Sequence, residues 1–335
     1  MLEKPVHILG AGGIGVALAW SLLRNGSDTT LVDANPAKVE AGRKQGLSVA
    51  GYGTQQAQFV EFHDWAPPDD AVFLLCSKTY DNPAILAQLP EQAFLVPVQN
   101  GFDPQLDRRG HAAEGIASFV SECERDRPVT RITRQGELHI GARRDVTQSE
   151  RQMLAALADA FSAANLFPVR LVDDIRPYKA AKLMYNAAIS PLAASAGVDN
   201  GELLRDGLAK KLFFALLQEN YAILRHAGVP LARIGPFHPD NVSRILRVPG
   251  LASIMAVFFR PSLRGTYCSM APDIGTGHSE IDAYNGHLIR LADDLHCPIN
   301  RAAHALVERM VREKLKPGRE HLRQLAAELP VGTLA

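Results

Sequence analysis

The chain has 335 residues, 47% hydrophobic and 21% charged, so it is long enough for two globular domains and is not disordered in composition. Lysine plus arginine equals aspartate plus glutamate, 36 of each, which excludes the overall basic field that drives binding to nucleic acid or to anionic membranes. The apolar stretches are too short to span a bilayer, and the N-terminus passes into a predicted strand without a signal-peptide pattern. We therefore expect a cytoplasmic protein whose partners are small molecules.

The first predicted strand, 6–9, runs directly into Gly10-x-Gly12-x-x-Gly15, and a helical pattern then continues to Leu23. At a strand-to-helix turn, free backbone amides and the helix dipole favour a phosphate. Gly10 would allow the tight turn, Gly12 the close approach of a pyrophosphate, and Gly15 the packing of helix on strand. The sequence therefore predicts a dinucleotide site. The turn residues expected to bind the cofactor are Gly10, Gly12, Gly13, Ile14 and Gly15.

A second predicted strand, 29–32, ends at Asp33. Asp33 follows the glycine turn by close to the ~20 residues at which a carboxylate accepts hydrogen bonds from the hydroxyls of the adenosine ribose. A carboxylate there would repel a 2′-phosphate, so we expect NAD rather than NADP. The alternative is an ordinary acidic turn residue before Asn35-Pro36.

Further strand patterns at 71–76 and 94–98, separated by helical or loop segments, indicate the βαβ alternation of a doubly wound parallel sheet. Patterns at 136–141 and 168–172 are expected to extend that sheet. We place a Rossmann-type, dinucleotide-binding domain at residues 1–173.

Beyond Asp173 the strand signal disappears, and an all-α substrate domain is expected at residues 174–330. Gly197 and Gly228 fit left-handed positions that end the first two helices. The predicted helices are 175–197, 203–227, 239–260, 279–296 and 299–315.

The cysteines show no CxxC or Cys/His ligand spacing, so neither a metal site nor a disulfide framework is indicated. They are Cys76, Cys123, Cys268 and Cys297. We assign no metal, and we interpret His7 on the first strand as a core or edge residue rather than as a catalyst.

Five short segments follow one another along the chain. They are GAGGIG at 10–15, CSKTYD at 76–81, VQNG at 98–101, KLMYNAAISPL at 182–192 and CSMAPDIGTGHSEIDAYNG at 268–286. Together they resemble the ketopantoate reductase (2-dehydropantoate 2-reductase) family over nearly the whole chain. The resemblance implies reduction of a 2-oxo acid to the D-2-hydroxy acid by hydride transfer from a nicotinamide cofactor.

In this family the lysine that opens the KLxxN motif is the catalytic acid, so the resemblance gives that role to Lys182. Asn186 and Ser190 follow at i+4 and i+8, which places all three on one helix face that could line the cleft between the domains. The alternative for Lys182 is a solvated surface lysine. Pro191 removes one intrahelical hydrogen bond and should kink this helix.

The resemblance assigns four more residues. Glu280 would sit near Lys182 and favour its charged form, although an acidic residue in a first helical turn is also stabilising by itself. Ser269 would bind the substrate carboxylate, and Asn100, after the strand at 94–98, would contact nicotinamide and substrate. Lys78 would lie on the cofactor side, with a simple surface lysine as the alternative.

Two positions depart from the family pattern. Asp33 stands where an arginine usually grips the 2′-phosphate of NADP, although Lys38 and Arg43 lie close by in sequence. Ser190 replaces an asparagine that binds the hydroxyl of ketopantoate, which shortens the reach and removes a donor. The substrate is therefore expected to be ketopantoate or a more apolar, branched or aromatic 2-oxo acid.

Two other functions remain open at this point. An opine-type or imine-reducing dehydrogenase shares the two-domain plan and acts on C=N, and a non-catalytic protein could sense NAD(H) through its helical domain. The apolar helices of the second domain are compatible with a homodimer.

Overall fold

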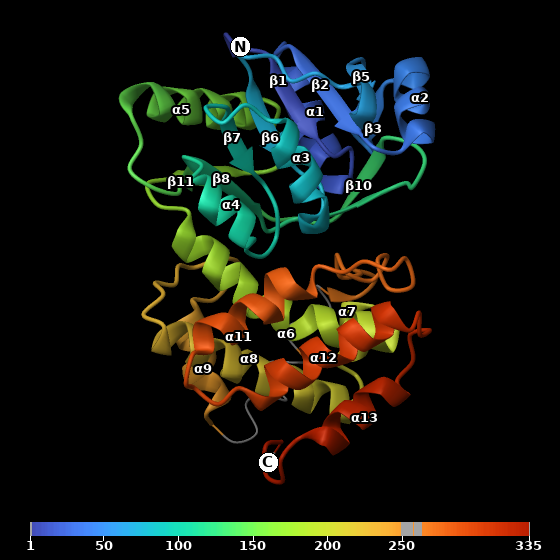
Figure 1. Cartoon of the computed structure of the whole chain (residues 1–335), viewed down its shortest axis with the longest axis vertical. Helices are drawn as coiled ribbons and strands as arrows, with labels where there is room; N and C mark the ends of the chain where they lie inside the picture. Colours follow the sequence, from blue (N-terminus) through green and yellow to red (C-terminus); the bar gives the residue numbers. More distant parts are fainter. Residues whose placement is uncertain (1, 249–256, 258–262, 335) are drawn as a thin grey trace. The chain divides into compact units, whose positions relative to one another are not determined.

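The computed structural model describes residues 2–248, 257 and 263–334 and divides into two compact units (Figure 1). Unit 1 contains Met1–Gln99 and Pro104–Ile175, and unit 2 contains Asn100–Asp103 and Arg176–Ala335. The short segment Asn100–Asp103 therefore belongs to unit 2, although its sequence lies inside unit 1.

A five-stranded parallel sheet forms the centre of unit 1, in the order β5-β2-β1-β6-β7. Val6 of β1 lies between Thr29 of β2 and Val72 of β6. The strands are β1 (Val6–Leu9), β2 (Thr29–Asp33), β5 (Gln58–Glu61), β6 (Val72–Leu75) and β7 (Phe94–Pro97). Four of them were predicted, because continuous apolar runs are typical of a parallel sheet covered on both faces. The edge strand β5 was missed because polar residues interrupt its apolar pattern.

Two smaller sheets complete unit 1, in the orders β4-β3-β10-β9 and β12-β11-β8. The strands are β3 (Leu47–Val49), β4 (Gly53–Gln55), β8 (Ala113–Ala117), β9 (Val120–Cys123), β10 (Val129–Arg134), β11 (Leu138–Ala142) and β12 (Val169–Val172). The strands expected near 136–141 and 168–172 exist, but the expectation that they extend the main sheet is wrong. They pair with each other and with β8, whose small residues gave no strand signal.

The helices of unit 1 have clear local causes. Asn35 caps α2, where its side-chain oxygen accepts from the amides of Ala37 and Lys38. Thr147 and Glu150 form a reciprocal capping box at the start of α5. The helices are α1 (Gly13–Arg24), α2 (Pro36–Gln45), α3 (Asn82–Gln88), α4 (Pro104–Arg109) and α5 (Gln148–Ala163), with 3₁₀ turns η1 (Phe62–Asp64) and η2 (Thr79–Asp81).

Unit 2 is helical in the part that the structure describes, as predicted. Its elements are α6 (Arg176–Ala196), α7 (Asn200–Leu203), α8 (Gly207–His226), α9 (Pro239–Leu246), the π-helix η3 (Asp282–Gly286), α11 (His287–Ala292), α12 (Pro298–Arg312) and α13 (Glu320–Glu328). Gly197 and Gly228 have φ of 69° and 65° after α6 and α8, so the predicted helix ends are confirmed. Much of the helix predicted at 239–260 lies outside the described residues.

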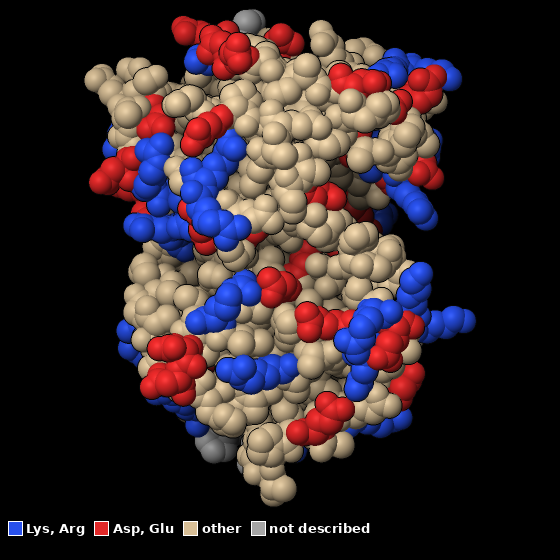
Figure 2. Space-filling model, viewed as in Figure 1, with Lys and Arg blue, Asp and Glu red and all other residues tan. Residues whose placement is uncertain are grey.

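Each unit has its own hydrophobic core. Phe102 joins the core of unit 2, together with helices from α6 to α13, whereas the two apolar clusters of unit 1 lie on β1, β6, α1 and α5 or next to them. Acidic and basic side chains are interspersed on the face seen in Figure 2, in line with the balanced charge. Among the described helices, none combines the length and apolar character needed to cross a membrane.

Candidate active site

The glycine turn of unit 1 has the shape of a ligand cradle. Gly10 has φ of 106°, and a Cβ on it would lie 2.6 Å from the amide nitrogen of Ser77. A Cβ on Gly15 would lie 1.9 Å from the carbonyl oxygen of Gly10, so the helix packs tightly against the turn. Around Gly12, in contrast, a Cβ would meet nothing within 4 Å. This open space lies at the N-terminus of α1, where the first amides have no intrahelical acceptor.

The carboxylate of Asp33 is fixed at the end of β2. It accepts hydrogen bonds from the amide of Ala11 at 2.7 Å and from the amide of Asn35 at 2.8 Å. The carbonyl of Ala11 accepts in turn from Nζ of Lys38 at 3.2 Å, and only 8% of Lys38 is exposed. The Cys123 thiol also donates to this carbonyl, and burial raises its pKa. Asp33 therefore lies directly beside the glycine turn.

These residues fit a dinucleotide. The open position at Gly12 leaves room for a pyrophosphate, and Asp33 has the chemistry that a ribose diol requires. On the other side of the turn, a Cβ on Gly13 would lie 2.7 Å from the Ser121 hydroxyl oxygen, which is buried without a hydrogen-bond partner among the described residues. Ile14 is half-buried in the first turn of α1. Sequence reasoning missed Ser121, because the strand β9 that brings it here gave no pattern.

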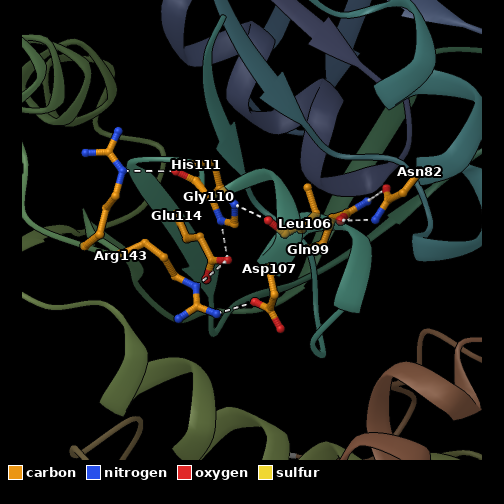
Figure 3. Close-up of polar contacts among 9 residues, drawn as sticks. Asn82, Gln99, Leu106, Asp107, Gly110, His111, Glu114 and Arg143 are labelled. Carbon is orange, nitrogen blue, oxygen red and sulfur yellow. Dashed lines mark hydrogen bonds and ion pairs between the residues drawn. The ribbon is translucent and has the colours of Figure 1, made fainter. Parts of the chain in front are cut away.

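A buried amide pair fixes the chain where β7 ends (Figure 3). Gln99 and Asn82 donate to each other's side-chain oxygens at 2.9 and 3.2 Å, and Gln99 also donates to the carbonyl of Ser77 at 2.8 Å. Lys78, the next residue, is half-buried and precedes η2. The loops after β6 and β7 are thus linked at the carboxyl ends of the strands, where open α/β sheets bind ligands.

A second polar cluster of unit 1, also drawn in Figure 3, is structural. The ring nitrogens of His111 face the Leu106 carbonyl at 3.1 Å and the Glu114 carboxylate at 2.6 Å. Arg143 donates to the same carboxylate oxygen at 3.2 Å and also pairs with Asp107. These contacts join α4, β8 and the end of β11.

In unit 2, Lys182, Asn186 and Ser190 lie on α6, so their spacing puts them on one helix face. Lys182 and Asn186 are half-buried and Ser190 is 2% exposed. The structure thus brings these three predicted residues together along one stripe of the helix.

A buried tyrosine links two further predicted residues. The hydroxyls of Ser269 and Tyr284 lie 2.9 Å apart, and Tyr284 is fully buried. Burial raises the pKa of Tyr284 well above its usual range, and the nearby charge of Glu280 raises it further. Glu280 itself is 3% exposed. Ser269 and Glu280 are therefore grouped around a phenol that stays neutral, and sequence reasoning did not identify this tyrosine.

Asn100, half-buried, starts the short segment that belongs to unit 2. A Cβ on Gly101, which has φ of 76°, would lie 2.7 Å from the Ala283 carbonyl oxygen. The amide of Phe102 donates to that carbonyl at 2.9 Å, and the Phe102 ring stacks on His287 with centroids 4.5 Å apart. This segment is thus anchored on η3 and α11, directly after Asn100.

Comparison with known proteins extends this description. The family model described as "Ketopantoate reductase PanE/ApbA" matches residues 6–145, and that described as "Ketopantoate reductase PanE/ApbA C terminal" matches residues 174–311. The 2-dehydropantoate 2-reductase of Pyrococcus abyssi is 24% identical over 315 residues, which cover 90% of this chain and 96% of that protein.

Two solved structures show the same architecture. A PanE/ApbA family ketopantoate reductase from Ralstonia eutropha JMP134 is 25% identical, with a TM-score of 0.72, and the match covers 92% of this chain and 99% of that one. D-mandelate dehydrogenase in complex with NADH has a TM-score of 0.72 over 93% of this chain and 100% of that one; at 18% identity this shows a shared fold.

The parallel sheet and the glycine turn are those of a dinucleotide-binding fold, and a helical unit accompanies it. The chain belongs to the ketopantoate reductase family. It is therefore a 2-oxo acid reductase that uses a nicotinamide cofactor.

Proposed function

We propose that this chain reduces ketopantoate, or a related branched or aromatic 2-oxo acid, to the D-2-hydroxy acid with NADH. The observation that carries the proposal is the composition of unit 2. It combines the α6 stripe of Lys182, Asn186 and Ser190 with the cluster in which Tyr284 links Ser269 to Glu280. A cation, amides and hydroxyls of this kind suit a substrate with a carboxylate and a polarised carbonyl.

The glycine turn and Asp33 would hold a nicotinamide cofactor, which would supply the hydride that reduces the carbonyl carbon. Lys182 donates a proton to the carbonyl oxygen as the C=O π bond breaks, which gives the hydroxyl group. Its ammonium also stabilises the negative charge that develops on this oxygen. The Glu280 carboxylate favours the charged form of Lys182 before transfer. Ser269 binds the substrate carboxylate, and Asn100 and Asn186 orient substrate and nicotinamide.

The preference for NADH rests on the surroundings of Asp33. Its carboxylate is held by two amides, beside the turn where the adenosine ribose would bind. Two basic side chains that follow Asp33 in sequence donate to backbone carbonyls, Lys38 to that of Ala11 and Arg43 to that of Phe59 at 3.0 Å. Neither is therefore directed at a 2′-phosphate, whose charge Asp33 would repel.

The substrate class follows from Ser190. It is almost fully buried on the stripe, and its hydroxyl reaches less far than the amide that the family usually carries there. A substrate without the ketopantoate hydroxyl loses little at this position. A screen of NADH oxidation against 2-oxo acids, ketopantoate included, identifies the substrate, and turnover that requires an added amine would contradict carbonyl reduction.

Replacement of the proton donor tests the mechanism. Lys182→Ala is expected to lower kcat by at least ~100-fold while the Kd for NADH changes little, because the lysine acts in the chemical step. Full turnover in this variant would reject the assignment.

We also propose a homodimer, which light scattering of the purified protein tests.

A further inference from the structure

The π-helix η3 connects three segments that carry predicted site residues. Its consecutive residues Ala283, Tyr284 and Asn285 each bond to a different segment. The Ala283 carbonyl accepts from the amide of Phe102, close to Asn100; the Tyr284 hydroxyl bonds to Ser269; and Asn285 Nδ2 donates to the Ala187 carbonyl of α6 at 2.9 Å. π-Helices are rare and occur often at functional sites.

The hydrogen bond from Asn285 to α6 compensates for a hydrogen bond that α6 cannot form at Pro191. In an α-helix the Ala187 carbonyl accepts from the amide four residues on, but that residue is Pro191, which has no N–H. A buried carbonyl without a donor is destabilising, because it loses its hydrogen bonds to water and gains none in exchange. Ala187 and Asn285 are both 0% exposed, so bulk water does not supply the missing donor. The Asn285 amide supplies it.

The orientation of the Asn285 amide is fixed by a chain of buried partners. The Glu219 carboxylate accepts from Asn300 Nδ2 at 2.8 Å, so the oxygen of Asn300 must face away from Glu219. This oxygen accepts the second N–H of Asn285, also at 2.8 Å. Nδ2 of Asn285 therefore points at two acceptors, one of which is the Ala187 carbonyl.

We propose that Asn285 is a positioning residue that replaces the missing amide of Pro191. It thereby holds the Lys182–Asn186 stripe of α6 in register with η3. The π-helix η3 in turn holds Ser269 and the Asn100 segment. The inference rests on the proposed function, because it takes these residues as the substrate site. Ala187 is adjacent to Asn186 and just over one helical turn from Lys182. Loss of the hydrogen bond between Asn285 and Ala187 would therefore shift the Lys182–Asn186 stripe directly.

Asn220 provides a matched control. It is also 0% exposed, it bonds to the same Asn300, and its Nδ2 donates to the α6 carbonyl of Met184 at 2.9 Å. The residue four positions after Met184 is Ala188, which has its own N–H. Asn220 therefore adds a second donor, whereas Asn285 supplies the one that proline removes.

The test is a double-mutant cycle of Asn285→Ala and Pro191→Ala in the full-length protein, with Asn220→Ala as control. Each variant is assayed for Tm, for the Kd for NADH, and for kcat and KM with the 2-oxo acid. Asn285→Ala is expected to lower kcat about tenfold or more with an unchanged Kd for NADH, because small misplacements of catalytic groups are costly. In the Pro191→Ala background, the new backbone amide serves Ala187, so removal of Asn285 should cost less than ~3-fold in kcat. Asn220→Ala should lower Tm but not kcat.

The proposal would be overturned if removal of Asn285 lowered kcat equally with and without Pro191. It would also be overturned if Asn285→Ala lowered Tm but left kcat unchanged. If Asn285→Ala is insoluble, the proposal requires the double variant to be soluble, and insolubility of both contradicts it. If the wild-type protein reduces no 2-oxo acid, the proposed function fails, while coupling between Pro191 and Asn285 in Tm still shows whether the hydrogen bond is replaced.

Discussion

Tyr284 holds the Ser269 hydroxyl through a hydrogen bond inside unit 2, where burial and Glu280 keep the phenol neutral. Tyr284→Phe removes this bond and retains the ring. Because one hydrogen bond is worth about 1 kcal/mol, we expect the KM for the 2-oxo acid to rise about fivefold. The Kd for NADH should not change, since Tyr284 bonds to Ser269, whose predicted partner is the substrate carboxylate and not the cofactor.

Tyr221→Phe is the control for this prediction, because Tyr221 donates to Asp240 at the same distance, 2.9 Å, away from the predicted site residues. Both variants should lose similar stability, as measured by Tm. A rise in KM of the same size in both would show that Tyr284 acts only through the stability of unit 2.

His7 of β1 makes stability depend on pH. Its Nδ1 accepts from the indole of Trp65 at 3.1 Å, and burial lowers its pKa below the usual 6.5. Between the unfolded and the folded pKa, the unfolded chain binds more protons, so stability falls as pH falls below about 6.5. We expect His7→Asn to flatten the dependence of Tm on pH between 7 and 5. The same change at the exposed His296 should leave the slope unchanged, and an equal effect of both changes would contradict the role of His7.

Individual site residues differ in how far the sequence predicts them. The cofactor-binding roles proposed for Asp33 and the glycines depend on local backbone order, so they could be predicted without tertiary information. Asn285 and Tyr284 could not, because their partners Ala187 and Ser269 are distant in sequence. The one local signal was Pro191: a proline inside a buried helix requires a donor for the carbonyl four residues earlier, but no pattern says which side chain supplies it.

In the strand-to-helix turn, one glycine is expected to serve ligand binding and another the stability of the fold. Gly12 has φ of −80° and ψ of −170°, which any residue adopts, and a Cβ there meets open space. Gly12→Ala should therefore leave Tm nearly unchanged and raise the Kd for NADH about tenfold or more, because the methyl group occupies the place of the pyrophosphate.

Gly15→Ala is expected to do the reverse at the same turn. Its Cβ would lie 1.9 Å from the Gly10 carbonyl oxygen, so α1 must move away from the turn at a cost of about 1–3 kcal/mol. We expect Tm to fall by several degrees in calorimetry. Unchanged Tm in this variant, or a large fall in Gly12→Ala, would show that the two glycines do not divide the roles in this way.

Element prediction succeeded where a pattern is local and regular, as in β1, β6, β7 and α6. It failed for β8 and β9, where small or polar residues form strands because neighbouring strands complete them. It also treated 279–296 as one helix. The structure has the π-helix η3 followed by α11, which ends at Ala292 and is followed by Asp293 with φ of 49°. Residues of η3 bond to Phe102 and Ser269 outside the helix, and such contacts cannot be predicted from a local pattern.

At the scale of the whole molecule, each unit has its own core, and both tryptophans, Trp20 and Trp65, lie in unit 1. Trp20 is 3% exposed and donates to the Gly53 carbonyl at 2.9 Å, and Trp65 is 6% exposed. Intrinsic tryptophan fluorescence should therefore report the unfolding of unit 1 alone. Unit 2, which contains Lys182, has no tryptophan and does not contribute to this fluorescence.

A ligand that binds the folded state raises its stability by RT ln(1 + [L]/Kd), about 2.7 kcal/mol at a hundred times Kd. For a unit of this size we expect NAD⁺ at that concentration to raise the Tm seen by tryptophan fluorescence by ~5–10 °C. NADP⁺ at the same concentration should shift it much less under the proposed preference for NADH, because the Asp33 carboxylate would repel the 2′-phosphate, while Lys38 and Arg43 donate to backbone carbonyls. Lys182→Ala should keep the full NAD⁺ shift, since the role proposed for Lys182 is in the chemical step and not in cofactor binding. An equal shift with NADP⁺ would refute the preference for NADH, and loss of the shift in Lys182→Ala would mean that Lys182 itself contributes to cofactor binding.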